Sequence, residues 1–165
     1  MNTQLLKQIE LIIDDEQMML YDILSLRENE NNILRIIVMP KTKIDNDGNL
    51  IGVDIDKCAK ISRLISPLLD VEEDAIKELF GYDEYILEVS SPGIERKLKQ
   101  TKHYKASIGE MLKIKDFNGN IIKGKLIQAN EEEIILETNH GNEIVSYDEI
   151  SSAKTYFQWH KNNKK

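Results

Sequence analysis

The sequence contains little of several residue types, and each shortage excludes a class of protein. Cys58 is the only cysteine among 165 residues, so the chain forms no internal disulfide and suits a reducing cytoplasm. No apolar run approaches the ~18 residues that cross a bilayer, and residues 1–4 lack the basic and apolar regions of a signal peptide. The three histidines are scattered and have no cysteine partners, which predicts no zinc site. We therefore expect a cytoplasmic protein without a metal or another cofactor.

Motifs of common enzyme classes are missing too. The sequence has no G-x-x-x-x-G-K-[ST] or G-x-G-x-x-G loop to hold a phosphate, and no G-x-S-x-G nucleophile turn. A small hydrolase would need an activated nucleophile or a metal, and neither is indicated. The sequence therefore favours a binding protein over an enzyme.

Charge is distributed unevenly along the chain. The net charge is −7, but residues 1–92 carry 9 Lys and Arg against 19 Asp and Glu, whereas residues 93–165 carry 13 against 10. An acidic surface repels nucleic acid, so RNA contact has to come from local basic surface. We expect such contact from the second half. The acidic first half indicates either a solvated surface or a face that meets basic proteins.

Apolar periodicity predicts an α+β domain over residues 1–92. Residues 3–15 carry apolar side chains at helical spacing, which predicts an amphipathic helix. Alternation over residues 18–26 and 33–39 predicts two strands of a hairpin, and residues 85–89 alternate like a third strand. Two or three helices on one face of a small three-stranded sheet would bury these apolar faces.

Further helices are predicted between the second and third strands. Asp54 is a candidate N-cap of a helix that carries several apolar residues on one face. Pro67 should kink this helix or end it near Ser66, because proline in a helix interior removes a backbone hydrogen bond. Residues 70–80 then predict a short helix, with Gly81 as its C-terminal stop.

The second half, residues 93–165, has a different pattern of apolar and turn residues. Five short β-prone runs follow one another at intervals of about ten residues, with turns rich in Asn and Gly between them. These runs are residues 111–115, 121–128, 133–138, 143–145 and 153–157. Five short strands of this kind predict a small β-barrel.

A Ser-Ser-Pro-Gly corner joins the two halves. It consists of Ser90, Ser91, Pro92 and Gly93. Proline fixes φ and pushes the residue before it into an extended conformation, and glycine accepts positive φ. Cations follow directly: Arg96, Lys97, Lys99, Lys102 and Lys105. This pattern is typical of an inter-domain turn with solvated lysines, and it also suits a basic surface held at a domain junction.

Two further groups are candidates for RNA contact. Lys113, Lys115, Lys123 and Lys125 alternate with apolar residues in predicted strands, so they should line the outer face of the barrel. Contact with RNA and simple surface solubility are equally compatible with this pattern. The tail, residues 156–161, interleaves aromatic and basic side chains that can stack on unpaired bases. Core capping by Phe157 and a frayed basic end explain the tail better.

Four sequence blocks resemble one known family. Residues 87–98, Leu-Glu-Val-Ser-Ser-Pro-Gly-Ile-Glu-Arg-Lys-Leu, resemble the L-E-V-S-S-P-G-[LI]-[DE]-R-P-L signature of the ribosome maturation factor RimP family. Residues 52–62 resemble its G-V-x-x-D-D-C-A-x-[VI]-S segment. Residues 68–72 and 34–38 resemble its L-D-V-E block and its L-R-[VI]-x-[VI] strand. The blocks follow the family's order, with Lys97 in place of its usual proline.

The resemblance implies a fold and a function. The expected fold is an N-terminal α+β domain followed by a C-terminal SH3-like (Sm-like) barrel of five strands. The expected function is non-catalytic binding to the immature small (30S) ribosomal subunit, by a monomer without affinity for DNA or membranes, to assist subunit assembly. The alternative is a stand-alone Sm-like RNA-binding module, which would bind short free RNA without needing the acidic domain.

Overall fold

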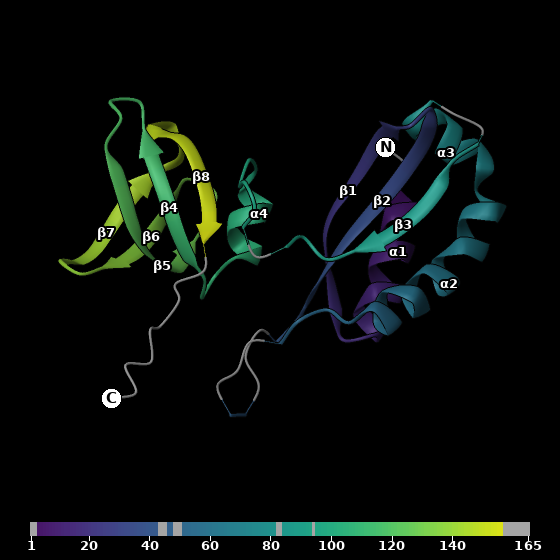
Figure 1. Cartoon of the computed structure of the whole chain (residues 1–165), viewed down its shortest axis with the longest axis horizontal. Coiled ribbons are helices and arrows are strands. Elements are labelled where there is room, and N and C mark those ends of the chain that lie inside the picture. Colours follow the sequence, from purple (N-terminus) through teal and green to yellow (C-terminus); the bar gives the residue numbers. More distant parts are fainter. Residues whose placement is uncertain (1–2, 43–45, 48–50, 82–83, 94, 157–165) are drawn as a thin grey trace. The chain divides into compact units, whose positions relative to one another are not determined.

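The computed structural model describes residues 3–42, 46–47, 51–81, 84–93 and 95–156. The chain divides into two compact units, Met1–Pro92 and Gly93–Lys165, which Figure 1 shows with their elements labelled. Each unit has its own sheet and its own cluster of buried apolar side chains. The architecture is therefore mixed α+β. In the described part of the chain, no helix is long and apolar enough to cross a membrane.

The first unit is built on a three-stranded sheet in the order β1-β2-β3. The strands are β1 (Met18–Glu28), β2 (Asn31–Pro40) and β3 (Ile86–Ser90). β2 is central, antiparallel to β1 and parallel to β3. Asn29 and Glu30 join β1 to β2 with φ of 51° and 67°, and positive φ at both central residues gives a tight hairpin turn. The three predicted strands are confirmed: β1 and β2 are longer than predicted, and β3 begins and ends one residue later.

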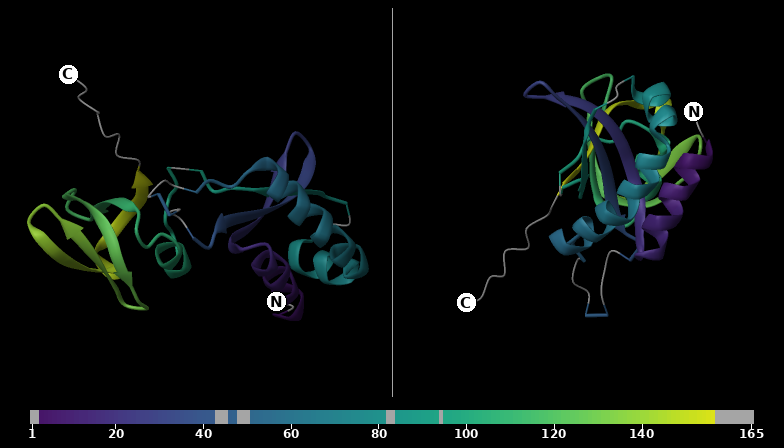
Figure 2. Two further views of the ribbon diagram at one scale, coloured as in Figure 1. Left: turned by 90° about the horizontal axis from the view of Figure 1, so that it is seen from below. Right: turned by 90° about the vertical axis from the view of Figure 1, so that its right-hand side faces the viewer.

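Three helices accompany this sheet: α1 (Thr3–Asp15), α2 (Ile55–Val71) and α3 (Glu73–Phe80). α1 and α2 contact each other and cover the same face of the sheet (Figure 2). Their inward residues, such as Ile13 and Ile65, are fully buried against β2 side chains such as Ile36. Asp54 caps α2 by accepting a hydrogen bond from Lys57 N at 2.6 Å, as predicted. The apolar periodicity thus locates the core of this unit correctly.

The expectation that α2 kinks or ends near Ser66 is wrong in its second part, because the helix continues past Pro67 to Val71. Ile65 and Leu69, on either side of the proline, are 0% and 1% exposed. Burial of these two side chains offsets the backbone hydrogen bond that Pro67 removes, which costs about 3 kcal/mol in an isolated helix interior. α3 then ends at Gly81, whose φ of 77° confirms the predicted C-terminal stop.

The second unit is a five-stranded antiparallel sheet in the order β7-β6-β5-β4-β8. Its strands are β4 (Met111–Asp116), β5 (Ile121–Ala129), β6 (Glu133–Thr138), β7 (Gly141–Ser146) and β8 (Ile150–Tyr156). A 3₁₀ turn, η1 (Tyr147–Glu149), precedes β8. All five strands coincide with predicted runs. Within the described residues β7 and β8 are not paired, so a closed SH3-like barrel stays a prediction.

Two elements of the second unit were not predicted. The helix α4 (Thr101–Ala106) follows Gln100, and its Tyr104 packs into the core of the sheet. The segment before it runs along β8: Leu98 N donates to Ala153 O at 2.9 Å, and Thr155 N donates to Arg96 O at 3.0 Å. Lys97 forms a β-bridge with Lys154. This segment therefore covers part of the edge of β8.

Candidate nucleic-acid interface

The sheet of the second unit separates apolar from basic side chains by strand alternation. On β4, Leu112 and Ile114 are fully buried. The residues that alternate with them, Lys113 and Lys115, lie on the opposite face. On β8, Ala153 and Thr155 are buried, and Lys154 is exposed between them. One face of the sheet thus makes the core, and the other carries the cations.

The pairing register brings these cations into a compact grid. Lys113 lies at its centre, opposite Lys123 of β5 and Lys154 of β8. Two residues away in each direction, Met111 lies between Lys125 and Tyr156, and Lys115 lies between Ile121 and Ser152. Lys97 extends the central row beyond Lys154 through its β-bridge. We name this surface the lysine face; its cations are Lys97, Lys113, Lys115, Lys123, Lys125 and Lys154.

The grid is electrostatically unfavourable by itself. Lysines directly opposite each other across strands repel, and each such pair costs a fraction of a kcal/mol, up to about 1 kcal/mol. Within the part of the chain that the structure describes, none of the six lysines forms an ion pair. The like charges lie side by side in the central row of Lys97, Lys154, Lys113 and Lys123, whereas Lys125 lies opposite Glu137 of β6. The central row is suited to an anionic partner that supplies the missing countercharge.

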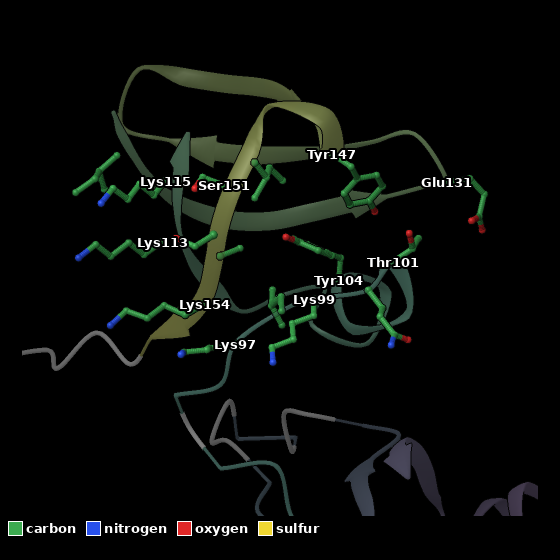
Figure 3. A pocket seen from close by; sticks show the side chains of 16 residues that line it. Lys97, Lys99, Thr101, Tyr104, Lys113, Lys115, Glu131, Tyr147, Ser151 and Lys154 are labelled. Atoms are coloured by element: carbon green, nitrogen blue, oxygen red, sulfur yellow. The ribbon is translucent and has the colours of Figure 1, made fainter. Parts of the chain in front are cut away.

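A groove of about 960 Å³ adjoins the lysine face along β8. Figure 3 shows Lys97, Lys113, Lys115 and Lys154 extending to one side of β8, with Tyr104 and Tyr147 on its other side. The two tyrosine rings pack edge to face, with centroids 5.1 Å apart. Lys99 lines the groove as well, and Glu131 lies at its tyrosine end, away from the lysines. The positive potential of the groove is therefore concentrated on the lysine side.

The cations after the corner do not form one surface. Lys97 joins the lysine face and Lys99 lines the groove, whereas Lys102 and Lys105 lie on α4. Lys105 forms an ion pair with Glu131, which lowers its availability to an external anion. The sequence predicted these cations as a continuous basic stretch. The structure divides them between the segment that precedes α4 and α4 itself.

Arg96 is the clearest correction among the predicted contact residues. Its side chain is only 7% exposed and forms a bidentate ion pair with Glu110, with Nη1 2.9 Å from Oε1. Its Nη2 also donates to Ser107 Oγ at 2.8 Å, and Ser107 Oγ donates to the carbonyl of His103 at 2.7 Å. Arg96 therefore ties its own segment to the turn between α4 and β4, from inside the unit. It is not part of the exposed basic surface.

The sequence missed one member of the lysine face. Lys154 lies in the last predicted strand, between two positions that alternate inward, so the same alternation that identified Lys113 could have found it. Of the predicted aromatic tail only Tyr156 is described, and Lys123 Nζ lies 5.9 Å from the centroid of its ring. Partial burial raises the pKa of the Tyr156 hydroxyl, so it stays neutral beside the lysines. Residues 157–161 lie outside the described residues.

The corner has the backbone that its residues predict. Ser90 ends β3, and Gly93 has a φ of 81°, a conformation in which a side chain is strained. No atom would lie within 4 Å of a Cβ at Gly93, so the conformation alone selects glycine there.

A reactive cysteine and a metal site are weakly supported. Burial raises the pKa of the Cys58 thiol, which disfavours the reactive thiolate. Among the described residues, no group of three or more His, Cys, Asp and Glu side chains is placed to hold a metal ion. The lysine face is therefore the site that we carry forward.

Comparison with known protein families identifies the first unit. A family model described as the RimP N-terminal domain matches residues 8–95, more than half of the chain. The chain belongs to the RimP family. This is a family of ribosome maturation factors, which implies a ribosome-related partner. The match ends at Glu95, before Lys97, the first residue of the lysine face. The family assignment and the lysine face are therefore independent observations.

Proposed function

We propose that this protein binds the immature small (30S) ribosomal subunit in the cytoplasm and assists its assembly without catalysing a reaction. Membership of the RimP family supports a role in ribosome maturation. The lysine face, with six cations and no ion pair among the described residues, is the observation that supports contact with ribosomal RNA. The resemblance of residues 87–98 supports the finer assignment to the small subunit, and it supports an SH3-like barrel as the fold of the second unit.

The proposed mechanism is selective binding. A factor that binds one conformation of nascent RNA more tightly than another shifts the population toward it by the difference in binding free energy. The lysine face supplies phosphate contacts, and release of condensed counterions makes such contacts favourable at low salt. Once the subunit matures, the preferred conformation is gone and the factor dissociates.

The two units have different roles in this proposal. Residues 1–92 carry 9 basic against 19 acidic residues, so the first unit is repelled by RNA and suits contact with a basic ribosomal protein. Two weak contacts from one chain reinforce each other when both can engage the same particle. A stand-alone RNA-binding module would not need the first unit.

The test is co-sedimentation of the purified protein with immature small subunits, mature small subunits and mature large subunits. We expect pelleting with immature small subunits at low salt and much less with the other two. Failure to pellet with immature particles, or equal pelleting with large subunits, would contradict the proposal. Equally tight binding by a chain that lacks residues 1–92, provided that it folds, would favour the RNA-binding module.

A further inference from the structure

The lysine face has an aromatic side chain at each end. Tyr156 lies at one end, paired with Met111 across the β4–β8 ladder. Phe117 lies at the other end, in the turn between β4 and β5 that follows Lys115, and it is 74% exposed. An exposed phenylalanine contributes little to folding, because its ring stays in water. The Phe117 ring is thus open to a partner, and the Tyr156 ring lies partly buried beside Lys123.

The turn that carries Phe117 is closed by several hydrogen bonds to Asp116. The Asp116 carboxylate accepts hydrogen bonds from Asn118 N at 2.9 Å and from Asn120 N at 2.8 Å. Asn120 Nδ2 donates to the other carboxylate oxygen of Asp116 at 3.0 Å. Gly119 supplies the positive φ of 85° that closes the turn. The backbone hydrogen bond from Asn120 is the largest cause that lowers the pKa of Asp116, so the carboxylate is ionised at neutral pH. The turn therefore holds Phe117 out in a defined position.

The dimensions fit a short single strand of RNA. From Met111 to Phe117 the chain advances six residues, which spans about 20 Å at strand geometry. At about 3.4 Å per stacked nucleotide this is room for about six nucleotides. Lysines bind the phosphates of single strands and duplexes alike, whereas aromatic rings stack on bases that are unpaired.

We propose that the lysine face binds unpaired RNA, with lysines on its phosphates and with Tyr156 and Phe117 stacked on bases near the two ends of the bound segment. This inference rests on the proposed function and names the RNA feature that the site recognises. It also supplies the selectivity, because segments that are unpaired in an immature subunit become paired or covered as the subunit matures.

The test is fluorescence anisotropy of the full-length protein with a labelled pyrimidine-rich oligonucleotide of 12 ribonucleotides, alone and annealed to its complement, at low salt. We expect tighter binding of the single strand. Phe117→Ala and Tyr156→Ala should each weaken it by roughly 5- to 150-fold, with little effect on the duplex. Tyr156→Phe and Phe117→Trp should retain single-strand binding, because they retain the ring.

Ile144→Ala is the matched control, because it removes an apolar side chain that is 63% exposed on β7, outside the lysine face. It should bind both RNAs like the wild type. Equal affinity for single strand and duplex, or unchanged single-strand binding in both alanine variants, would overturn the inference. If wild-type protein still pellets with immature subunits in that case, the proposed function stands and only the preference for unpaired RNA is lost. Failure to pellet would instead refute the proposed function.

Discussion

Replacing Arg96 with methionine separates a structural from an RNA-binding role for this residue. Methionine keeps much of the aliphatic volume but removes the charge that pairs with Glu110. Removing one partner of a buried ion pair costs about 3–5 kcal/mol, because the other charge stays buried. The Glu110 side chain is 23% exposed and can recover some hydration, so we expect a loss of about 2–4 kcal/mol.

The assay is thermal unfolding followed by circular dichroism, together with RNA binding below the transition. For a unit of this size, 1 kcal/mol corresponds to about 4–8 °C, so the transition of the second unit should fall by roughly 8–32 °C. An Arg96→Met/Glu110→Leu double variant should recover much of this loss, because an apolar pair of similar volume replaces a buried ion pair at little cost. Ser107 keeps its hydrogen bond to the His103 carbonyl in either variant.

Lys113→Met is the matched control for charge. It removes one cation from the centre of the lysine face, so it should weaken RNA binding while leaving the melting temperature unchanged or slightly raised. The opposite pattern for Arg96→Met, with an intact melting temperature and lost RNA binding, would refute the structural role and return Arg96 to the contact surface.

Three further variants test the described packing and backbone. Gly124→Ala would place a Cβ 2.8 Å from the backbone oxygen of Glu137, so thermal unfolding should show a loss of about 1–3 kcal/mol; an unchanged melt would contradict the close approach of β5 and β6. Asp54→Ala removes the cap of α2 and should cost about 1 kcal/mol in urea unfolding, and no change would show that the cap is dispensable. Gly93→Val forces a side chain into a φ of 81° and should cost about 1–3 kcal/mol, while pelleting with immature subunits falls further than stability does. Proportional losses would make the corner purely structural, and no loss in either measurement would remove it from the account.

The sequence predicted the elements whose signals are local. The periodicity of α1, the alternation of β2 and the turn residues between the strands each depend on neighbouring positions. The same alternation placed Lys113 and Lys123 on an outer face before their register was known. Family resemblance added the expectation of an SH3-like barrel and of a role in ribosome maturation, which periodicity alone does not supply.

The features that sequence-based prediction missed depend on contacts between residues that are distant in the sequence. Pro67 was expected to interrupt α2, but burial of the residues on either side outweighs the local propensity. The partner of Arg96, Glu110, lies 14 residues away, and no sequence pattern distinguished this arginine from the lysines that follow it. The grid around Lys113 depends on which strands pair. Here β4, the first strand of the sheet along the chain, pairs with β8, the last.

The most direct test of the account is the salt dependence of pelleting with immature small subunits for a Lys113→Glu/Lys154→Glu variant. If both lysines contact phosphates, the slope of log affinity against log salt should lose about 0.7–0.9 for each contact removed, and binding at low salt should fall. The control, Lys7→Glu/Arg63→Glu, makes the same change in net charge outside the lysine face, on α1 and α2 of the first unit, and should pellet with an unchanged slope. Equal slopes for wild type and the Lys113→Glu/Lys154→Glu variant would show that the lysine face does not hold the ribosomal RNA.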